Sequence, residues 1–302
     1  MSAWLQKKFN MVHLSCYTGY FLRNMRTYLI VALLGIDFFN VALADPLTVG
    51  IFPRRDAAVT AKLFRPFANY LEKELQRPVK LELSPNFDVF LKRLEERRYD
   101  LVHFNQFEYI NAHDRLNYDV IVQNEELGEK TIRGAIYVRR DSGIENTQQL
   151  KGKNILFGGG KRAMMSYIVP TYLLRQAGLK RGDYKESYAS NPPNAVLATF
   201  QKQVDAGGAG EIVSRLPLVT KKIDIKELNL IAVSEALPHL PWAVKKEMDS
   251  NLKLRITELM LNMNSNKKGK EVLKKARISA FNPASDWHYN SHRIIIDSVY
   301  AN

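Results

Sequence analysis

The sequence feature that most constrains the fold is a run of three glycines between a short apolar segment and a longer helical one. Residues 155–157 have the pattern of a buried strand, residues 158–160 are all glycine, and a helical pattern follows. Glycine lets the backbone turn tightly and lets a ligand come close to it. A helix start offers unpaired N–H groups and a partial positive charge, so this unit predicts a corner that receives an anion.

The region after this turn predicts a second unit of the same kind. Residues 194–202 form a helical pattern and residues 204–208 a short strand, which would deliver Glu211 to the same edge. Elsewhere, apolar side chains recur with the helical period in segments such as 60–76, and strand-like segments lie between them. This alternation predicts an α/β fold with mostly parallel sheets flanked by helices.

The boundaries of the segments follow from where each pattern starts and stops. Pro78 ends the helical pattern that begins at residue 60, and Gly152 ends a shorter one. Strands are expected at 47–52, 79–83, 101–104, 118–123, 134–139, 155–157, 204–208 and 228–234. Helices are expected at 60–76, 87–97, 106–116, 148–152, 194–202, 212–220, 249–263, 269–276 and 284–299.

The start of the chain has the pattern of an export signal. Met25 and Arg26 precede an apolar run at 29–36, and small residues then lead to Ala44. This pattern predicts a signal peptide that is cleaved after Ala44 and releases the product into the periplasm. Residues 1–24 fit the signal poorly, so we expect them to be a spurious upstream extension of a chain that starts at Met25. The alternative is an uncleaved anchor, although the apolar run is shorter than the ~20 residues that span a bilayer.

The single cysteine and the net charge are consistent with export, and they limit the kinds of ligand and partner that we expect. The single cysteine, Cys16, precedes the expected cleavage point, so the mature chain would hold no disulfide and no thiolate metal site. Residues 1–44 carry four basic side chains and one acidic, so cleavage lowers the formal charge from +13 to +10. A basic surplus attracts anions. Nucleic acid is not expected, because the basic residues are scattered and no recognition motif is present.

Motifs for catalysis or for a cofactor are not found. The chain has no Gly-x-Ser-x-Gly elbow and no Cys–His pair, which disfavours a nucleophilic hydrolase. The glycine turn lacks the spacing of a P-loop. His288 and His292 would share one helix face, but without a third ligand they make a poor metal pair. We therefore expect no enzyme activity, no cofactor and no metal.

Several segments, in this order and spacing, give the chain its resemblance to a known family. It resembles the periplasmic phosphate/phosphite/phosphonate-binding proteins of ABC importers, which have the type II periplasmic-binding fold. The resemblance covers nearly all of the mature chain. Its markers are Val49–Ile51, Asp100–Phe104, Gly152–Pro170, Asn194–Val196 with Gln203–Ala206, Leu237–Pro238 and Phe281–Asp286.

The resemblance implies two α/β lobes joined by two crossover strands, with the ligand held between the lobes. Lobe one would comprise residues 45–137 and 236–302, and lobe two residues 138–235, with crossovers near 137–139 and 232–234. Closure around the ligand would be a hinge motion.

The resemblance also implies a set of ligand-binding residues, and this chain departs from the family at several of them. Ala163, Met164 and Met165 stand where the family has a Ser-Thr-Ser cluster, and Lys161 and Arg162 could replace the lost donors with charge. The whole implied set is Phe87, Phe104, Gly159, Gly160, Lys161, Arg162, Ala163, Met164, Met165, Ser166, Asn191, Glu211 and Leu240.

Other departures lie at further positions of the expected cleft. Phe87 and Phe104 replace two tyrosines of the family, Leu240 falls near an acid and Asn191 near a histidine, whereas the acid at Glu211 is kept. The ligand could therefore be another oxyanion or a more apolar molecule packed against Phe87, Phe104, Met164, Met165 and Trp242. Each of these side chains also has a plainer interpretation: core for the apolar ones, a solvated turn for Lys161 and Arg162, and a cap or surface pair for Glu211.

These observations together predict a secreted, monomeric, non-enzymatic protein that binds a small anionic ligand. Its membrane partner would be the permease of an ABC importer. The alternative is a signalling role, in which the closed form docks onto the ectodomain of a membrane sensor kinase or cyclase without transport.

Overall fold

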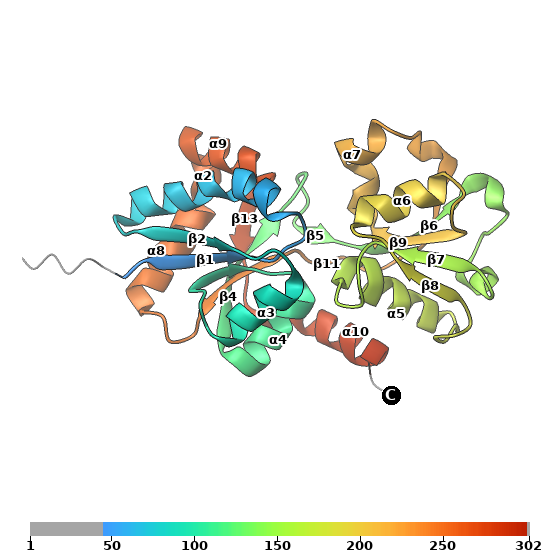
Figure 1. The fold of residues 1–302 in the computed structure, drawn as a ribbon, viewed down its shortest axis with the longest axis horizontal. Coiled ribbons are helices and arrows are strands. Elements are labelled where there is room, and N and C mark those ends of the chain that lie inside the picture. Colours follow the sequence, from blue (N-terminus) through green and yellow to red (C-terminus); the bar gives the residue numbers. More distant parts are fainter. Residues whose placement is uncertain (1–44, 301–302) are drawn as a thin grey trace, which may run out of the picture. The chain divides into compact units, whose positions relative to one another are not determined.

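The computed structural model describes residues 45–300, and their strands form two mixed sheets and a short two-stranded ribbon. The order of the six-stranded sheet is β13-β4-β12-β3-β1-β2, and that of the five-stranded sheet is β10-β6-β9-β7-β8 (Figure 1). The two lobes of the predicted α/β fold correspond to these two sheets. The sheets were expected to be mostly parallel, but both are mixed, because each contains antiparallel strand pairs beside the parallel ones. The expected signal peptide and its cleavage after Ala44 lie outside the described residues.

The six-stranded sheet has helices on both faces. In Figure 1, α2 and α9 cover one face while α3 and α4 cover the other, and α8 packs with α2. The strands are β1 Leu47–Ile51, β2 Val79–Leu83, β3 Leu101–His103, β4 Tyr118–Glu125, β12 Pro241–Lys245 and β13 Ala280–Pro283. The helices are α2 Ala57–Leu75, α3 Phe87–Glu95, α4 Gln106–Leu116, α8 Ser250–Leu261, a 3-10 turn at Met263–Ser265 and α9 Lys267–Ala276.

The five-stranded sheet is built in the same way around a glycine-rich central strand. The strands are β6 Gly134–Arg139, β7 Asn154–Phe157, β8 Lys185–Tyr188, β9 Ala206–Gly210 and β10 Leu228–Val233. The helices are a π-helix at Met164–Ile168, α5 Val169–Gln176, α6 Pro192–Phe200 and α7 Pro217–Thr220, with 3-10 turns at Arg140–Ser142, Thr147–Leu150, Glu211–Arg215 and Ile225–Glu227. The π-helix and α5 pack on one face, and α6 and α7 on the other.

The connections between the sheets lie closer to the first sheet than the sequence indicated. Strands β5 (Thr131–Ile132) and β11 (Leu237–Pro238) pair with each other and link the two sheets. Residues 137–139 and 232–234 were expected to be crossovers. Instead, 137–139 belong to β6 and 232–233 to β10, because the buried, apolar β6 pairs with both β9 and β10. The lobe boundaries at 137/138 and 235/236 otherwise stay predictions.

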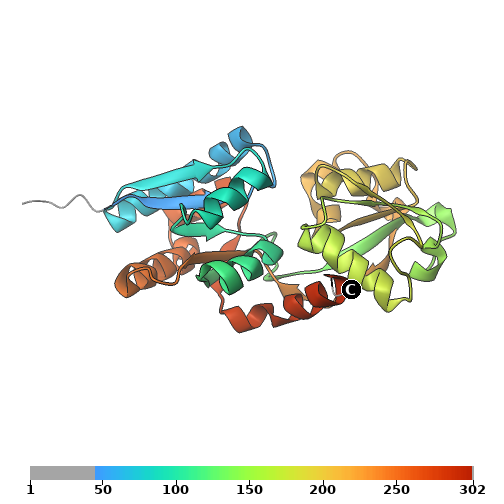
Figure 2. The same ribbon diagram turned by 60° about the horizontal axis from the view of Figure 1, so that its bottom comes forward.

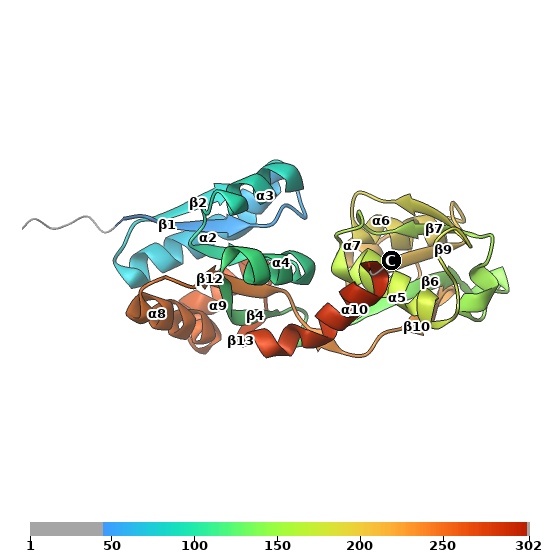
Figure 3. The same cartoon turned by 90° about the horizontal axis from the view of Figure 1, so that it is seen from below.

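The C-terminal helix connects elements that belong to both sheets. Helix α10 (Asn290–Tyr300) follows a 3-10 turn at Asp286–Tyr289 and contacts both α4 and α5 (Figures 2 and 3). Its Ile295 and Val299 belong to the core cluster of the second sheet. The helix assigned from sequence to lobe one therefore contributes to the core of lobe two.

Several element boundaries differ from the expected ones for local reasons. Helix α2 begins at residue 57 and not 60, because the Asp56 carboxylate accepts a hydrogen bond from the Val59 N–H and caps the helix. The helix expected at 212–220 is divided into a 3-10 turn and α7, since Pro217 starts a new helix. The pattern did not reveal β8, whose residues are mostly charged or exposed, or β12, which begins with proline.

Candidate ligand-binding site

Many of the predicted site residues gather at the carboxyl edge of the second sheet. Strands β7 and β9 are parallel neighbours, so the chain leaves both at the same edge. The glycine turn and the π-helix follow β7, and Glu211 follows β9. A Cβ placed on Gly210 would lie 3.7 Å from the Cβ of Met165, and one on Gly158 would meet Pro192, next to Asn191. The structure therefore brings the turn, Asn191 and Glu211 together.

The backbone of the turn needs glycine at one position. Gly159 has a φ of +144°, which side chains other than glycine rarely adopt, and a Cβ there would lie 2.9 Å from the Cβ of Ala163. Gly160 has open space around its Cα. The turn is therefore held tightly against the start of the π-helix.

The π-helix that follows leaves three backbone donors without a partner. The N–H groups of Met164, Met165 and Ser166 donate to no backbone carbonyl within residues 45–300. These are the first N–H groups of a helical segment that continues through α5, so the helix dipole adds partial positive charge. The side chains of Met164 and Met165 lie in the core of the second sheet. The hydrogen-bond donors at this position are therefore the backbone N–H groups and the buried Ser166, where the family has side-chain hydroxyls.

The two cations of the turn have different surroundings. Lys161 is exposed, and its ammonium forms no ion pair with any described residue, while its carbonyl accepts a hydrogen bond from the Tyr300 hydroxyl. Arg162 donates from Nε and Nη2 to the two carboxylate oxygens of Glu108, at 2.6 and 2.7 Å. These hydrogen bonds raise the pKa of Arg162. The Lys161 ammonium is therefore available to an anionic ligand, whereas the Arg162 guanidinium is already paired with Glu108 of α4.

Asn191 and Glu211 are placed by local structure. The Asn191 side chain caps α6 by accepting from the Asn194 N–H at 3.1 Å. Glu211 is half-buried, and its backbone bonds to Arg133 and Tyr137. No described residue forms an ion pair with its carboxylate.

The residues predicted on the first lobe are largely core. Phe104 is fully buried among Phe90, Tyr109 and Tyr118, and Leu240 is also buried in that cluster. Phe87 is half-buried, with its ring centroid 6.4 Å from that of Phe52. Trp242 is fully buried, and its indole N–H donates to Asn124 at 2.9 Å. Of these side chains, only Phe87 is open to a ligand in this structure.

The sequence analysis missed a group of polar side chains at the carboxyl edge of the first sheet. Arg54 and Arg55 follow β1, His103 ends β3, Glu126 follows β4, and His239 lies before β12. The available signal was a pair of arginines directly after a buried strand.

A metal site and a membrane span have no support among residues 45–300. No cluster of three or more His, Cys, Asp or Glu side chains there is arranged to hold a metal ion. His292, one half of the metal pair considered above, is fully buried. None of the described helices is long and apolar enough to cross a membrane.

Comparison with known proteins identifies the family. Residues 49–289 match the family model described as "ABC transporter, phosphonate, periplasmic substrate-binding protein". The chain is 24% identical over 246 residues to the phosphonates-binding periplasmic protein of Escherichia coli K12, covering 80% of this chain and 72% of that one. It is 22% identical over 284 residues to the probable ABC transporter phosphite binding protein PhnD1 of Prochlorococcus marinus MIT 9301, covering 89% and 95%.

Solved structures agree on the fold. The chain is similar to PhnD1 from Prochlorococcus marinus in complex with methylphosphonate, with a TM-score of 0.71 and 19% identity. The match covers 82% of this chain and 96% of that one. At this identity the likeness supports the two-lobed fold, and the ligand has to be argued from the site.

Proposed function

This chain belongs to the family of periplasmic substrate-binding proteins of ABC phosphonate transporters, and we propose that it captures a small phosphorus oxyanion and delivers it to an importer. Its role is binding and not catalysis. Its membrane partner is the permease of that importer, and it acts as a monomer. The curated relatives are named as a phosphonates-binding and a phosphite-binding protein, which supports a transport role over a sensor partner.

The observation that carries the proposal is the row of free N–H groups at Met164, Met165 and Ser166. They lie at the carboxyl edge of a doubly wound sheet, which is where ligands bind in such folds. Three free N–H groups at a helix start, together with the helix dipole, suit a tetrahedral oxyanion. Because backbone donors survive side-chain replacement, the loss of hydroxyls at Ala163–Met165 leaves this part of the site intact.

Lys161 supplies the charge that the backbone does not. It is exposed at the turn and forms no ion pair within residues 45–300, so it is available to an anion that reaches the helix start. Glu211, on the neighbouring strand end, borders the same position and disfavours a second negative charge there. We propose that the oxyanion contacts the N–H row and Lys161, with Ser166 and Asn191 beside it.

The test is a binding measurement on residues 45–302. Thermal shift and calorimetry with phosphate, phosphite, methylphosphonate, a sulfonate and a carboxylate would identify the class. A ligand at 100 times its Kd stabilises the folded protein by about 2.7 kcal/mol, a readily measured shift in Tm. We expect a phosphorus oxyanion to bind, Lys161→Ala to weaken it, and Lys151→Ala, on the exposed surface, to leave it unchanged. Folded protein that binds none of these phosphorus oxyanions would refute the proposal.

A further inference from the structure

The carboxyl edge of the first sheet carries a polar cluster that the proposed function does not use. Strands β1 and β3 are parallel, and β4 runs in the same direction, since both β3 and β4 are antiparallel to β12. Their ends therefore meet at one edge. We call the side chains gathered there the arginine–histidine cluster: Arg54, Arg55, His103, Glu126 and His239.

The cluster holds more positive than negative charge. Arg54 Nη2 lies 3.2 Å from Glu126 Oε1. Burial would raise the pKa of that carboxyl, but the charge of Arg54 and the hydrogen bond from Asn124 help to lower it. Arg55 forms no ion pair with any described residue. The neighbouring charge of Arg54, together with burial, lowers the pKa of Arg55 to about 9, and Arg277 adds to the effect. Glu126 opposes this shift only in part, so Arg55 remains a cation without an ion-pair partner among residues 45–300.

The hydrogen bonds around His103 fix which ring nitrogen carries a proton. An indole N–H can only donate, so the oxygen of the Asn124 amide faces Trp242, at 2.9 Å, and its NH₂ group faces His103. That group donates to His103 Nε2 at 3.2 Å, which therefore lacks a proton. Burial keeps the ring neutral by lowering its pKa. The proton is then on Nδ1, a buried N–H with no acceptor among the described residues.

His239 also has a buried ring N–H without an acceptor among the described residues, but its proton position is fixed by a different hydrogen bond. Its Nδ1 accepts a hydrogen bond from the Leu240 N–H at 2.8 Å, so the proton of the neutral ring is on Nε2. Burial again lowers the pKa of this histidine. Nε2 is buried and has no partner within residues 45–300. Two fixed donors thus lie unused beside two arginines.

Leaving the buried N–H groups of His103 and His239 unpaired costs free energy unless an acceptor binds to them. Buried donors are nearly always paired, and a lone one is a sign of an absent partner. Four groups of this cluster donate or carry positive charge, and the only acid, Glu126, is already held by Arg54. The missing partner therefore has to be an acceptor, and the unpaired Arg55 favours an anionic one.

We propose that the arginine–histidine cluster binds a second anionic group of the ligand, so that the substrate is a phosphorus oxyanion bearing a carboxylate or similar acid. This rests on the proposed function, which assigns the first oxyanion to the glycine turn. Arg55 makes the charged contact, and the N–H groups of His103 and His239 donate to the same acid. Both nitrogens are covered in this structure, so a neighbouring side chain shifts as the acid approaches.

The experiment compares two probes of equal chain length, 3-phosphonopropionate and propylphosphonate, by calorimetry at pH 7. The protein should bind 3-phosphonopropionate about 10- to 100-fold more tightly, as expected for a charge-assisted hydrogen bond. Arg55→Gln should abolish this preference while leaving propylphosphonate binding unchanged. Arg55→Lys should keep part of it. Arg65→Gln, at an exposed arginine of α2, is the matched control and should behave like the unmodified protein.

The outcomes separate this inference from the proposed function. If both probes bind equally, or if Arg55→Gln keeps the preference while its Tm shows that it is folded, the second-anion subsite is refuted and the phosphonate proposal stands. If neither probe nor methylphosphonate binds to folded protein, both proposals fail. A preference that only Arg55→Gln removes supports the subsite.

Discussion

Arg162 of the glycine turn is bound through two nitrogens to the carboxylate of Glu108, which is fully buried at the start of α4. The guanidinium also lies 5.2 Å from the ring centroid of Phe107, and the Asn105 amide is 3.4 Å from the Arg162 carbonyl. An arginine that the sequence offered as a ligand contact thus connects an element after the second sheet's β7 to one after the first sheet's β3.

The first prediction follows from the contrast between Arg162 and its neighbour Lys161. Arg162→Ala would leave the buried Glu108 carboxylate without its partner, so we expect a loss of about 1–3 kcal/mol in the free energy of unfolding. Lys161→Ala should change it by less than about 0.5 kcal/mol. Urea unfolding of both variants measures this. Equal stability of the two would show that the Arg162–Glu108 pair contributes nothing.

The second prediction concerns two adjacent glycines of the turn. Gly159→Ala places a Cβ at a φ of +144° and 2.9 Å from Ala163, which should cost about 1–3 kcal/mol and distort the N–H row. Gly160→Ala meets nothing within 4 Å and should be nearly neutral, so it is the matched control. Thermal unfolding and oxyanion titration of both variants test this. Wild-type affinity in folded Gly159→Ala would argue that the turn does not shape the site.

How much the sequence could predict depends on the range of the interactions involved. Helix α4 and strands β2 and β6 were placed to the residue, because their patterns and end signals are local. The glycine turn was found for the same reason. The partner of Arg162 was not, since Glu108 lies 54 residues earlier and is brought close only by the packing of the lobes.

Long-range packing also explains why the arginine–histidine cluster at the carboxyl edge of the first sheet could not be predicted. His103 and Glu126 are 23 positions apart, and His239 is more than a hundred further along, so no window of sequence shows them as a cluster. The proton position of His103 depends on Asn124 and Trp242, whose contact is also long-range. Phe104 shows a further limit: a family position suggested a ligand contact, and in this structure the ring is fully buried among core aromatic side chains.

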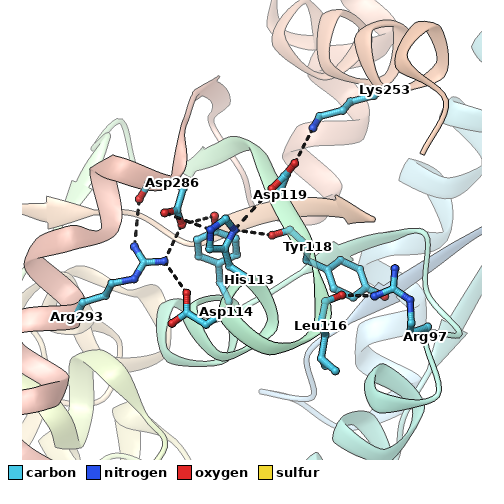
Figure 4. Close-up of polar contacts among 10 residues, drawn as sticks. Arg97, His113, Asp114, Leu116, Tyr118, Asp119, Lys253, Asp286 and Arg293 are labelled. Carbon is cyan, nitrogen blue, oxygen red and sulfur yellow. Dashed lines mark hydrogen bonds and ion pairs between the residues drawn. The ribbon is translucent and has the colours of Figure 1, made fainter. Parts of the chain in front are cut away.

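The third prediction concerns the attachment of α10. Arg293 donates to Asp286 at 2.8 Å and to Asp114 at 3.2 Å (Figure 4). The Tyr109 hydroxyl also donates to Asp286. Asp286→Asn removes the charge that holds Arg293 and should destabilise the protein by about 1 kcal/mol at pH 7. Asp114→Asn, at a more exposed partner, should cost less than about 0.5 kcal/mol.

The pH dependence gives this prediction a second readout. Burial alone would raise the pKa of Asp286, but Arg293 and Tyr109 more than offset it, so the pKa is lowered. The stabilisation is therefore present above the ordinary pKa of an aspartate and is lost as pH falls through the lower, folded-state value. The difference between the wild type and Asp286→Asn should shrink between pH 5 and pH 3. A difference that stays constant over this range would refute the role of the charge.

The last prediction concerns His292, a fully buried histidine of α10. Neither ring nitrogen has a partner among the described residues, and burial, with Arg293 nearby, lowers its pKa to about 3. In the unfolded chain a histidine takes up a proton near pH 6.5. The unfolded state therefore binds more protons than the folded state between pH 6.5 and 3, so stability falls as pH is lowered through this window.

Replacing this histidine should flatten the acid side of the stability curve. Between pH 7 and 4.5, His292 alone should account for a loss of about 2–3 kcal/mol, which His292→Leu removes because leucine takes up no proton. Urea unfolding at several pH values measures the slope, and the two proteins compared at pH 8 give the packing effect of the substitution by itself. Parallel curves for the two proteins below pH 6.5 would mean that the ring is protonated in the folded state, and that the burial of His292 does not hold its pKa down.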